Sequence, residues 1–212
     1  MMPNQSAPAR LGHAPVGEEH GSARQDTSGG SHLLTRRSQP YLPAEVRPVP
    51  INHFMSALTR VLLASDGSTT LLLQALTGGS IKANLTSLTH QPATRLPADL
   101  RSQLQIADKT TAIVRRSLLL DQHGTPVSRN EVIASGNNPL VRRVLTNPTR
   151  PIGLNLIAHA LDHSRRCHVT GLTSWNARLD AASKAYLVQV GDAPLMFIWE
   201  TYNPAAISPT IL

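Results

Sequence analysis

Two adjacent arginines, Arg115 and Arg116, stand in a strongly apolar run and could bind a carboxylate. Side chains in a strand alternate between two faces, so only one of the pair can point inward. The more uniformly apolar face belongs to Arg116, which shares it with Val114, Leu118 and Leu120. A buried guanidinium needs a partner, and its planar fork fits a carboxylate. The sequence therefore favours Arg116, although an exposed edge-strand arginine or an internal ion pair would give the same pattern.

Glu200 is a second candidate, because it is the one acidic residue in the apolar run 193–202. Met196 and Ile198 share its face in a strand. A carboxylate buried at such a position can exchange a proton with a bound ligand. A structural ion pair, for instance with Arg116 itself, accounts for the pattern equally well.

Pro151-Ile152-Gly153 opens a predicted helix. The first backbone N–H groups of a helix have no partner within it and attract anions. The motif is common and carries little weight alone. Beside an inward arginine it would supply a second contact for the same carboxylate, so Ile152 and Gly153 are candidate binding residues.

Other catalytic signatures are absent from the sequence. The nine histidines show no HExxH spacing, and the pair His159 and His163, four apart on a predicted helix, is more typical of a surface. No phosphate-binding loop, dinucleotide fingerprint or Gly-x-Ser-x-Gly nucleophile motif is present. Cys167 lies in an apolar strand pattern and is expected to be a packed thiol. We therefore expect neither a metal nor an organic cofactor.

The composition argues against several classes of protein. The chain has 212 residues, 41% of them hydrophobic, which allows one domain with a sizeable core. Aromatic residues make up only 3%, and the net charge of +7 comes from scattered basic pairs, so a nucleic-acid surface is not expected. No apolar run approaches the ~20 residues that cross a bilayer. With no secretory signal and a single cysteine, we expect a cytoplasmic monomer or small homo-oligomer that binds a small molecule.

The chain changes character near residue 49. Residues 1–48 are rich in Pro, Gly, Ser, Ala and His and lack apolar periodicity, so we expect a disordered tail, followed by a folded domain over 49–212. Helical periodicity begins at once. Four helices are predicted. The first spans 52–65, with Asn52 as its cap and an apolar face of Phe54, Leu58, Val61 and Leu62, and the second spans 69–77 and ends at Gly78-Gly79. The third begins at Asn138-Pro139 and the fourth at Pro151.

Between the helices lie runs with strand character. A strand is predicted at 80–90, a hairpin at 110–120 with 126–134, a strand at 167–172, and a second hairpin at 185–190 with 194–202 around Gly191-Asp192, while 173–183 is ambiguous. Strands that arrive as hairpins with helices between them indicate an antiparallel sheet. The sequence therefore predicts an α+β fold with about six antiparallel strands and helices on one side.

The order of these motifs resembles the chorismate pyruvate-lyase family over roughly residues 54–204. Members are small cofactor-free enzymes that convert chorismate into 4-hydroxybenzoate and pyruvate. The resemblance is nearer to the branch that supplies bacterial glycolipids or other secondary products than to the ubiquinone branch. It implies a six-stranded antiparallel sheet flanked by helices, with the aromatic product buried beneath helical flaps.

The resemblance also implies roles for particular residues. The strand arginine that holds the ring carboxylate falls on Arg116 when the turn 124–126 is aligned without a gap, and on Arg115 after a shift by one. The Pro-Leu-Gly motif, whose central amide meets the same carboxylate, falls on 151–153, and the late glutamate near the ring hydroxyl falls on Glu200. Thr69 would line the pocket.

The family pattern is altered at several positions. Ile152 replaces a leucine, which is a mild change because the backbone makes the contact. Trp199 replaces a threonine and Tyr202 a phenylalanine on either side of the glutamate. The basic-x-Tyr motif before the last hairpin is kept only as Lys184-Ala185-Tyr186.

The function implied by the resemblance is an elimination that aromatises the ring of chorismate. Arg116 and the Ile152 amide would hold the ring carboxylate, and Glu200 would assist the proton movement that accompanies C–O cleavage. Two alternatives stay open. The chain could be a non-catalytic module for a small aromatic acid, like the effector domains of GntR-type regulators, or a lyase acting on a related substrate such as aminodeoxychorismate.

Overall fold

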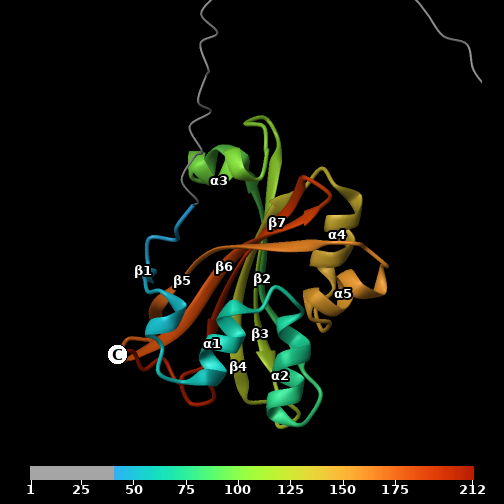
Figure 1. The fold of residues 1–212 in the computed structure, drawn as a ribbon. Helices are drawn as coiled ribbons and strands as arrows, with labels where there is room; N and C mark the ends of the chain where they lie inside the picture. The colour runs from blue at the N-terminus through green and yellow to red at the C-terminus, as the bar shows by residue number, and fades with distance from the viewer. Residues whose placement is uncertain (1–40) are drawn as a thin grey trace, which may run out of the picture. The chain divides into compact units, whose positions relative to one another are not determined.

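The computed structural model describes residues 41–212, which form a seven-stranded antiparallel sheet with helices on both faces (Figure 1). Along the sheet the strand order is β1-β5-β6-β7-β4-β3-β2. The strands are β1 (Arg47–Pro48), β2 (Lys82–Pro92), β3 (Thr111–Leu120), β4 (Pro126–Ser135), β5 (Ser164–Asn176), β6 (Leu179–Val190) and β7 (Ala193–Tyr202). The predicted α+β class with an antiparallel sheet is confirmed.

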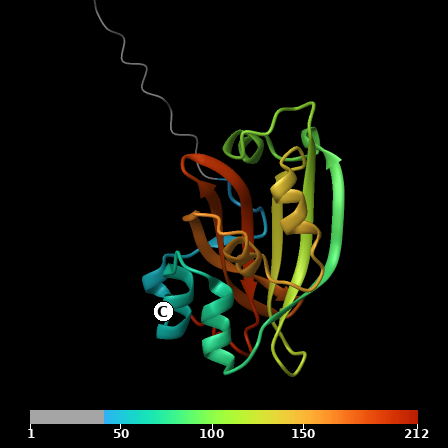
Figure 2. The same ribbon diagram turned by 90° about the vertical axis from the view of Figure 1, so that its right-hand side faces the viewer.

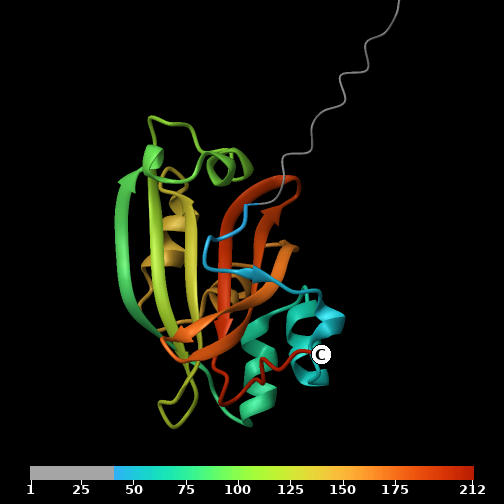
Figure 3. The same cartoon turned by 90° about the vertical axis from the view of Figure 1, so that its left-hand side faces the viewer.

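Five α-helices and two short 3-10 helices connect the strands. Their bounds are η1 (Ile51–His53), α1 (Ala57–Ala64), α2 (Thr69–Thr77), η2 (Ala93–Arg95), α3 (Ala98–Gln103), α4 (Pro139–Thr146) and α5 (Ile152–Ala158). Helices α4 and α5 lie in front of the sheet in Figure 2 and behind it in Figure 3, while α1 and α2 lie below them. We call the face that these four helices cover the inner face.

Both predicted hairpins are present, because β3 pairs with β4 and β6 with β7. The first turn is held by Asp121, whose carboxylate accepts hydrogen bonds from the backbone N–H groups of His123 and Thr125 at 2.9 and 2.8 Å. Gly124 in this turn has φ +81°, a conformation that favours glycine. The ambiguous stretch 173–183 belongs to a third hairpin, formed by β5 and β6.

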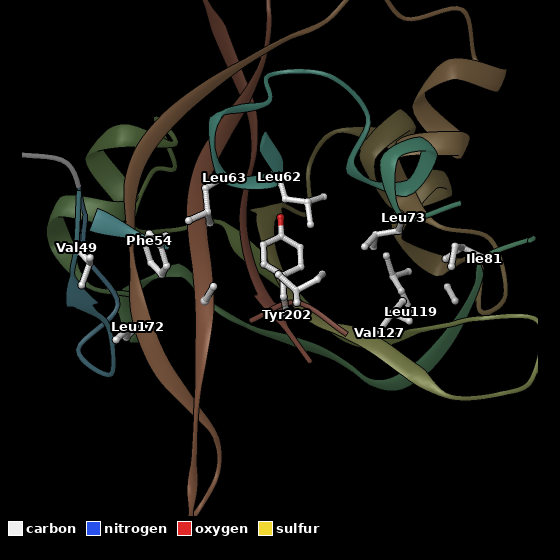
Figure 4. Packing of buried hydrophobic residues seen from close by; sticks show 13 residues of the cluster. Val49, Phe54, Leu62, Leu63, Leu73, Ile81, Leu119, Val127, Leu172 and Tyr202 are labelled. Carbon is white, nitrogen blue, oxygen red and sulfur yellow. The ribbon is translucent and has the colours of Figure 1, made fainter. Parts of the chain in front are cut away.

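The inner face carries two hydrophobic clusters. Helices α4 and α5 bury Val144, Leu145 and Leu156 against β6 and β7. Helices α1 and α2 cover the other end of the sheet, where Figure 4 shows Tyr202 below Leu62 in the centre of the second cluster. Polar residues between the two clusters form the site described below.

Helix α3 packs on the opposite face, so the helices are not confined to one side as the sequence suggested. Its residue Leu100 is fully buried against a cluster that includes Val114, Ile133 and Phe197. These strand residues alternate with those that face α4 and α5, because neighbouring side chains in a strand point to opposite faces. The sheet is therefore buried on both faces over β3, β4 and β7.

Three helix boundaries follow local chemistry. Helix α4 begins after Asn138, whose side chain accepts hydrogen bonds from the N–H groups of Leu140 and Val141, and α2 ends at Gly78 with φ +68°, both as predicted. The prediction for α1 was wrong at its start. Ser56 rather than Asn52 caps it, by accepting a hydrogen bond from Thr59 N at 3.3 Å.

The apolar face predicted for α1 was also placed incorrectly. Leu58 and Val61 are exposed, whereas Thr59, Leu62 and Leu63 are buried. Phe54 is fully buried but lies before the helix, where it forms a β-bridge with Ile211. The chain turns between Phe54 and Ala57, so residues on either side of the turn do not share a helical face.

The expected boundary of the tail also changes. Most of the predicted disordered segment, residues 1–40, lies outside the described residues. Within residues 41–48, however, Val46 is buried, and β1 pairs with β5 through Arg47 opposite Leu172 and Pro48 opposite Gly171. The folded domain therefore begins before residue 49. Among the described helices, none has the length and apolarity that crossing a bilayer requires.

Candidate functional site

A small cavity lies between the inner face of the sheet and helices α2 and α5. Its volume is about 30 Å³, room for roughly two water molecules. Eight of its fifteen lining residues are polar or charged, although apolar clusters lie on either side. The walls include Thr69 and Thr70 of α2, Arg115 and Ser117 of β3, Asn130 of β4, Ile152 and Gly153 of α5, Arg165 of β5, Tyr186 of β6 and Glu200 of β7.

Strand register explains why these polar residues meet. Ser117 lies opposite Asn130, Asn130 opposite Glu200, and Glu200 opposite Lys184. These four residues, which we call the polar row, cross four neighbouring strands on the inner face. Cross-strand neighbours on one face lie within contact distance of one another. The sheet therefore gathers residues that are up to 83 positions apart in sequence, from 117 to 200.

Arg115 is the arginine that points into the cavity. It is only 1% exposed and donates to Ser117 Oγ at 2.9 Å and to the Asn147 carbonyl at 3.1 Å. Its Nε is buried without a hydrogen-bond partner, and within residues 41–212 no carboxylate forms an ion pair with it. Burial lowers the pKa of the guanidinium to about 10. A buried cation without a counter-ion is costly, and an anionic ligand bound beside it would offset that cost.

Arg116 points the other way, so the predicted inward orientation was wrong. Its side chain is 55% exposed and forms an ion pair with Glu131 at 2.6 Å, directly opposite on β4. Val114, which made its face look apolar, packs beneath α3 on the outer face. The sheet has two buried faces, so counting apolar neighbours could not identify the inner one. The pairing with Glu131 also excludes the predicted alternative that Arg116 and Glu200 bind only each other.

Glu200 is buried, as expected, and accepts three hydroxyl hydrogen bonds. Thr69 and Tyr202 donate to Oε2 and Tyr186 donates to Oε1, each at 2.9 Å. Lys184 Nζ lies 3.9 Å from Oε2. A carboxylate has about four acceptor positions, so one on Oε1 is left for a ligand hydroxyl.

Burial determines the protonation of the groups around Glu200. It raises the pKa of Tyr186 and Tyr202 well above the ordinary value, and the negative charge of Glu200 raises both further. The two phenols therefore stay protonated and act as donors. Burial also lowers the pKa of Lys184, while the charge of Glu200 opposes that shift. Lys184 donates to the carbonyls of Leu62 and Ser65 at 2.8 and 3.1 Å, which fixes the end of α1 over the site.

The structure brings together the other predicted residues. Thr69, Ile152 and Gly153 all line the cavity with Arg115 and Glu200. At Gly153 the helix α5 comes so close to α2 that an added Cβ would lie 3.1 Å from Ser68 Oγ and 3.6 Å from Arg165 Nη2. A side chain at residue 153 would therefore need Ser68 to shift by a few tenths of an ångström.

Sequence reasoning did not single out Arg165, which lines the cavity. It also treated Lys184, Tyr186 and Tyr202 as departures from a motif, whereas they are the partners of Glu200. Their spacing held a usable signal, because Lys184 and Tyr186 share one face of β6, and Glu200 and Tyr202 share one face of β7. Within residues 41–212, no three His, Cys, Asp or Glu side chains gather as metal ligands would.

Comparisons with known proteins agree with this fold. Residues 63–208 match the family model described as Chorismate pyruvate-lyase Rv2949c-like. No curated protein matches the chain in sequence.

Two solved structures are similar at low identity. The crystal structure of PhnF from Mycobacterium smegmatis is 14% identical over 70% of this chain and 69% of that chain, with a TM-score of 0.53. The separate effector domain of PhnF is 13% identical over 75% of this chain and 93% of that chain, with a TM-score of 0.51. Likeness at this identity shows the fold alone. Because the family model covers well over half of the sequence, the chain belongs to the Rv2949c-like chorismate pyruvate-lyase family.

Proposed function

We propose that the protein is a lyase that converts chorismate into 4-hydroxybenzoate and pyruvate. The observation that carries the proposal is the pairing, in one cavity, of a buried arginine that has no carboxylate partner among residues 41–212 and a buried glutamate with a free acceptor position. Family membership supports the same reaction.

Arg115 takes the role that the sequence had given to Arg116. Its guanidinium would bind the ring carboxylate with charge-assisted hydrogen bonds, and the free N–H of Ile152 at the start of α5 would add a further donor. Glu200 would accept a hydrogen bond from the ring hydroxyl through Oε1. These contacts hold the ring at two opposite ends, which orients the C–O bond that breaks.

The reaction itself needs no external redox partner. The C3–O bond breaks with its electron pair leaving on the enolpyruvyl oxygen, and the proton at C4 is lost so that a new double bond completes the aromatic ring. Glu200 would assist that proton movement. Enolpyruvate then takes up a proton and becomes pyruvate.

Ligand binding requires the helices to move. Pockets for drug-sized ligands occupy about 300–1,000 Å³, far more than the cavity between α2 and α5 provides. We infer that α2 and α5 separate to admit the ring and close over it afterwards. Slow release of the product would follow from such closure.

The reaction is tested by incubating the purified protein with chorismate and following 4-hydroxybenzoate by chromatography, beside chorismate without protein. Arg115→Met should lower kcat/KM by about 10- to 100-fold, the value of a lost charge-assisted contact. Glu200→Gln should lower kcat by about 100-fold or more, because proton transfer is impaired.

Matched controls come from the opposite face of the same strands. Arg116→Met and Glu131→Gln remove the exposed ion pair and should leave turnover within about 2-fold of the wild type, because a surface pair contributes little. Wild-type protein that is folded and yields no product would refute the lyase. Equal losses in Arg115→Met and Arg116→Met would refute the assignment of the site.

A second candidate is a non-catalytic module that binds a small aromatic acid. The observation in its favour is the shared fold with the PhnF effector domain. It predicts tight binding of 4-hydroxybenzoate without turnover of chorismate, so the same incubation separates the two functions.

A further inference from the structure

A second arginine, Arg165, lines the cavity from β5, toward the opposite edge of the sheet from Arg115 on β3. It alternates with the exposed Arg166 along β5, so it lies on the inner face. The side chain is partly buried and donates from Nη1 to the Asp66 carbonyl at 3.2 Å. Its Nε is buried and has no hydrogen-bond partner in the described part of the chain. Arg165 thus resembles Arg115 in having a guanidinium that protein groups satisfy only in part.

The charges around the cavity do not balance. Its charged lining groups are Arg115, Arg165 and Glu200. The charge of Glu200 is matched by Lys184 at 3.9 Å, and among residues 41–212 neither arginine has a carboxylate within ion-pair distance. Two guanidinium charges are therefore left for one ligand. A buried charge without a counter-ion is costly, so a ligand with two negative charges fits better than one with a single charge.

The two arginines cannot easily share one carboxylate. Strands β3 and β5 are separated in the sheet by β4, β7 and β6. Arg115 lies in the cross-strand row of Ile198, whereas Arg165 lies in the next row, that of Met196. They therefore approach the cavity from opposite sides. The missing Cβ of Gly153 leaves space beside Arg165 Nη2, because a Cβ there would lie 3.6 Å from that nitrogen.

We propose that the cavity binds a dicarboxylate and that Arg165 binds the second carboxylate. The identity of this ligand rests on the proposed function: in chorismate the second carboxylate belongs to the enolpyruvyl side chain, which leaves as pyruvate. Arg165 would hold the leaving group while Arg115 holds the ring, and so fix the C–O bond between them. Arg165 is then a determinant of specificity for dianionic over monoanionic ligands.

Two non-reactive ligands test the proposal by calorimetry. One is 4-hydroxybenzoate, with a single carboxylate. The other is 3-(1-carboxyvinyloxy)-4-hydroxybenzoate, which has both carboxylates and cannot eliminate because its ring is already aromatic. Arg165→Met should weaken binding of the dicarboxylate by about 10- to 100-fold and that of 4-hydroxybenzoate by less than about 3-fold.

Neighbouring variants serve as controls. Arg166→Met removes an adjacent exposed charge and should change neither affinity. Arg115→Met should weaken both ligands alike, because both carry the ring carboxylate. Arg165→Lys keeps the charge without the planar fork, so it should keep part of the preference for the dicarboxylate even if Arg165→Met fails to fold.

The outcomes separate this inference from the lyase proposal. Equal losses for the two ligands in Arg165→Met, or no loss for either, would overturn the role of Arg165. Wild-type protein that binds the dicarboxylate no more tightly than 4-hydroxybenzoate would also overturn it, whatever the turnover. If Arg165→Met weakens binding of the dicarboxylate alone and the wild type forms no product from chorismate, the dicarboxylate site is supported and only the lyase activity is refuted.

Discussion

Glu200 depends on hydroxyl groups that come from three separate elements. Thr69 opens α2, Tyr186 lies on β6 and Tyr202 on β7, and all three donate to the same carboxylate. Hydrogen bonds to a charged group contribute about 1.5–3 kcal/mol each. The carboxylate is therefore held in one orientation before any ligand arrives. The titration of the Tyr186 and Tyr202 phenols tests whether they donate hydrogen bonds to it.

The stability of the protein should fall steeply in alkali because of Tyr186 and Tyr202. Their folded pKa values are raised, so between about pH 10, where the unfolded phenols ionise, and the folded pKa the folded state binds more protons. Their contribution to stability is fully present below about pH 10 and is lost as the pH rises toward the folded pKa. Two phenols give a slope of up to about 2.7 kcal/mol per pH unit.

Urea unfolding at several pH values from about 8 to 11 measures this slope. The wild type should lose free energy of unfolding more steeply above about pH 10 than the double variant Tyr186→Phe Tyr202→Phe. Tyr41→Phe is the control, since its phenol is less buried and should change the slope less. An unchanged slope in the double variant would contradict the protonated, donating state of the two phenols.

At the scale of elements, the site depends on how closely α2 approaches α5. The two helices meet where Ser68 faces Gly153, and both contribute lining residues to the cavity. Neither helix is long, with nine residues in α2 and seven in α5. Short helices gain most of their stability from packing, so a shift of one against the sheet is inexpensive compared with a change in the sheet itself.

A disulfide between these helices should block the site reversibly. The Cβ position at Gly153 lies 3.1 Å from Ser68 Oγ, close to the ~3 Å between a Cβ and the partner sulfur of a disulfide. We expect the double variant Ser68→Cys Gly153→Cys, in a Cys167→Ser background, to lose binding of 4-hydroxybenzoate when oxidised and to recover it with reductant.

Each single cysteine variant in the same background provides the control for the loss of the hydroxyl and the added side chain. Full binding by the oxidised double variant, with the disulfide confirmed by mass spectrometry, would show that ligands reach the cavity by another route. Loss that reductant does not reverse would indicate distortion of the site instead of closure.

At the scale of the molecule, β1 forms one edge of the sheet and pairs with β5. Gly171 permits this contact, because a Cβ there would lie 2.3 Å from the Arg47 carbonyl. Val46 and Val49 are buried beside it, and Val49 N donates to the Thr170 carbonyl at 3.0 Å. Residues 41–49 therefore belong to the folded domain in energetic terms, although they contain only a two-residue strand.

Deleting residues 1–50 should destabilise the protein by about 3–6 kcal/mol more than deleting residues 1–40 does. The extra deletion exposes the surface that two buried valines cover, each worth about 1.5–3 kcal/mol. The free energy of unfolding in urea measures the difference. Gly171→Ala in the full chain should cause a comparable loss by displacing β1. Equal stability of the two truncated proteins would show that β1 contributes nothing.

The sequence by itself determined many of the local elements and singled out several of the residues that line the cavity. Turn residues such as Gly124, the cap Asn138 and the alternation in the strands act over a few positions, so both predicted hairpins and the start of α4 could be located correctly. Motif order likewise singled out Thr69, Ile152, Gly153 and Glu200, which the structure brings to one cavity.

Only the tertiary structure decided which arginine faces that cavity and what surrounds Glu200. Both faces of the sheet are buried, so the apolar neighbours of Arg116 indicated burial without indicating the side. The ion pair with Glu131, its cross-strand partner, shows that the Arg116 side chain points away from the cavity. That pairing depends on the register of the hairpin formed by β3 and β4. Lys184 and Arg165 reach the site through the strand order β5-β6-β7-β4-β3. Such long-range pairing is fixed by the packing of the whole sheet, which no local pattern in the sequence encodes.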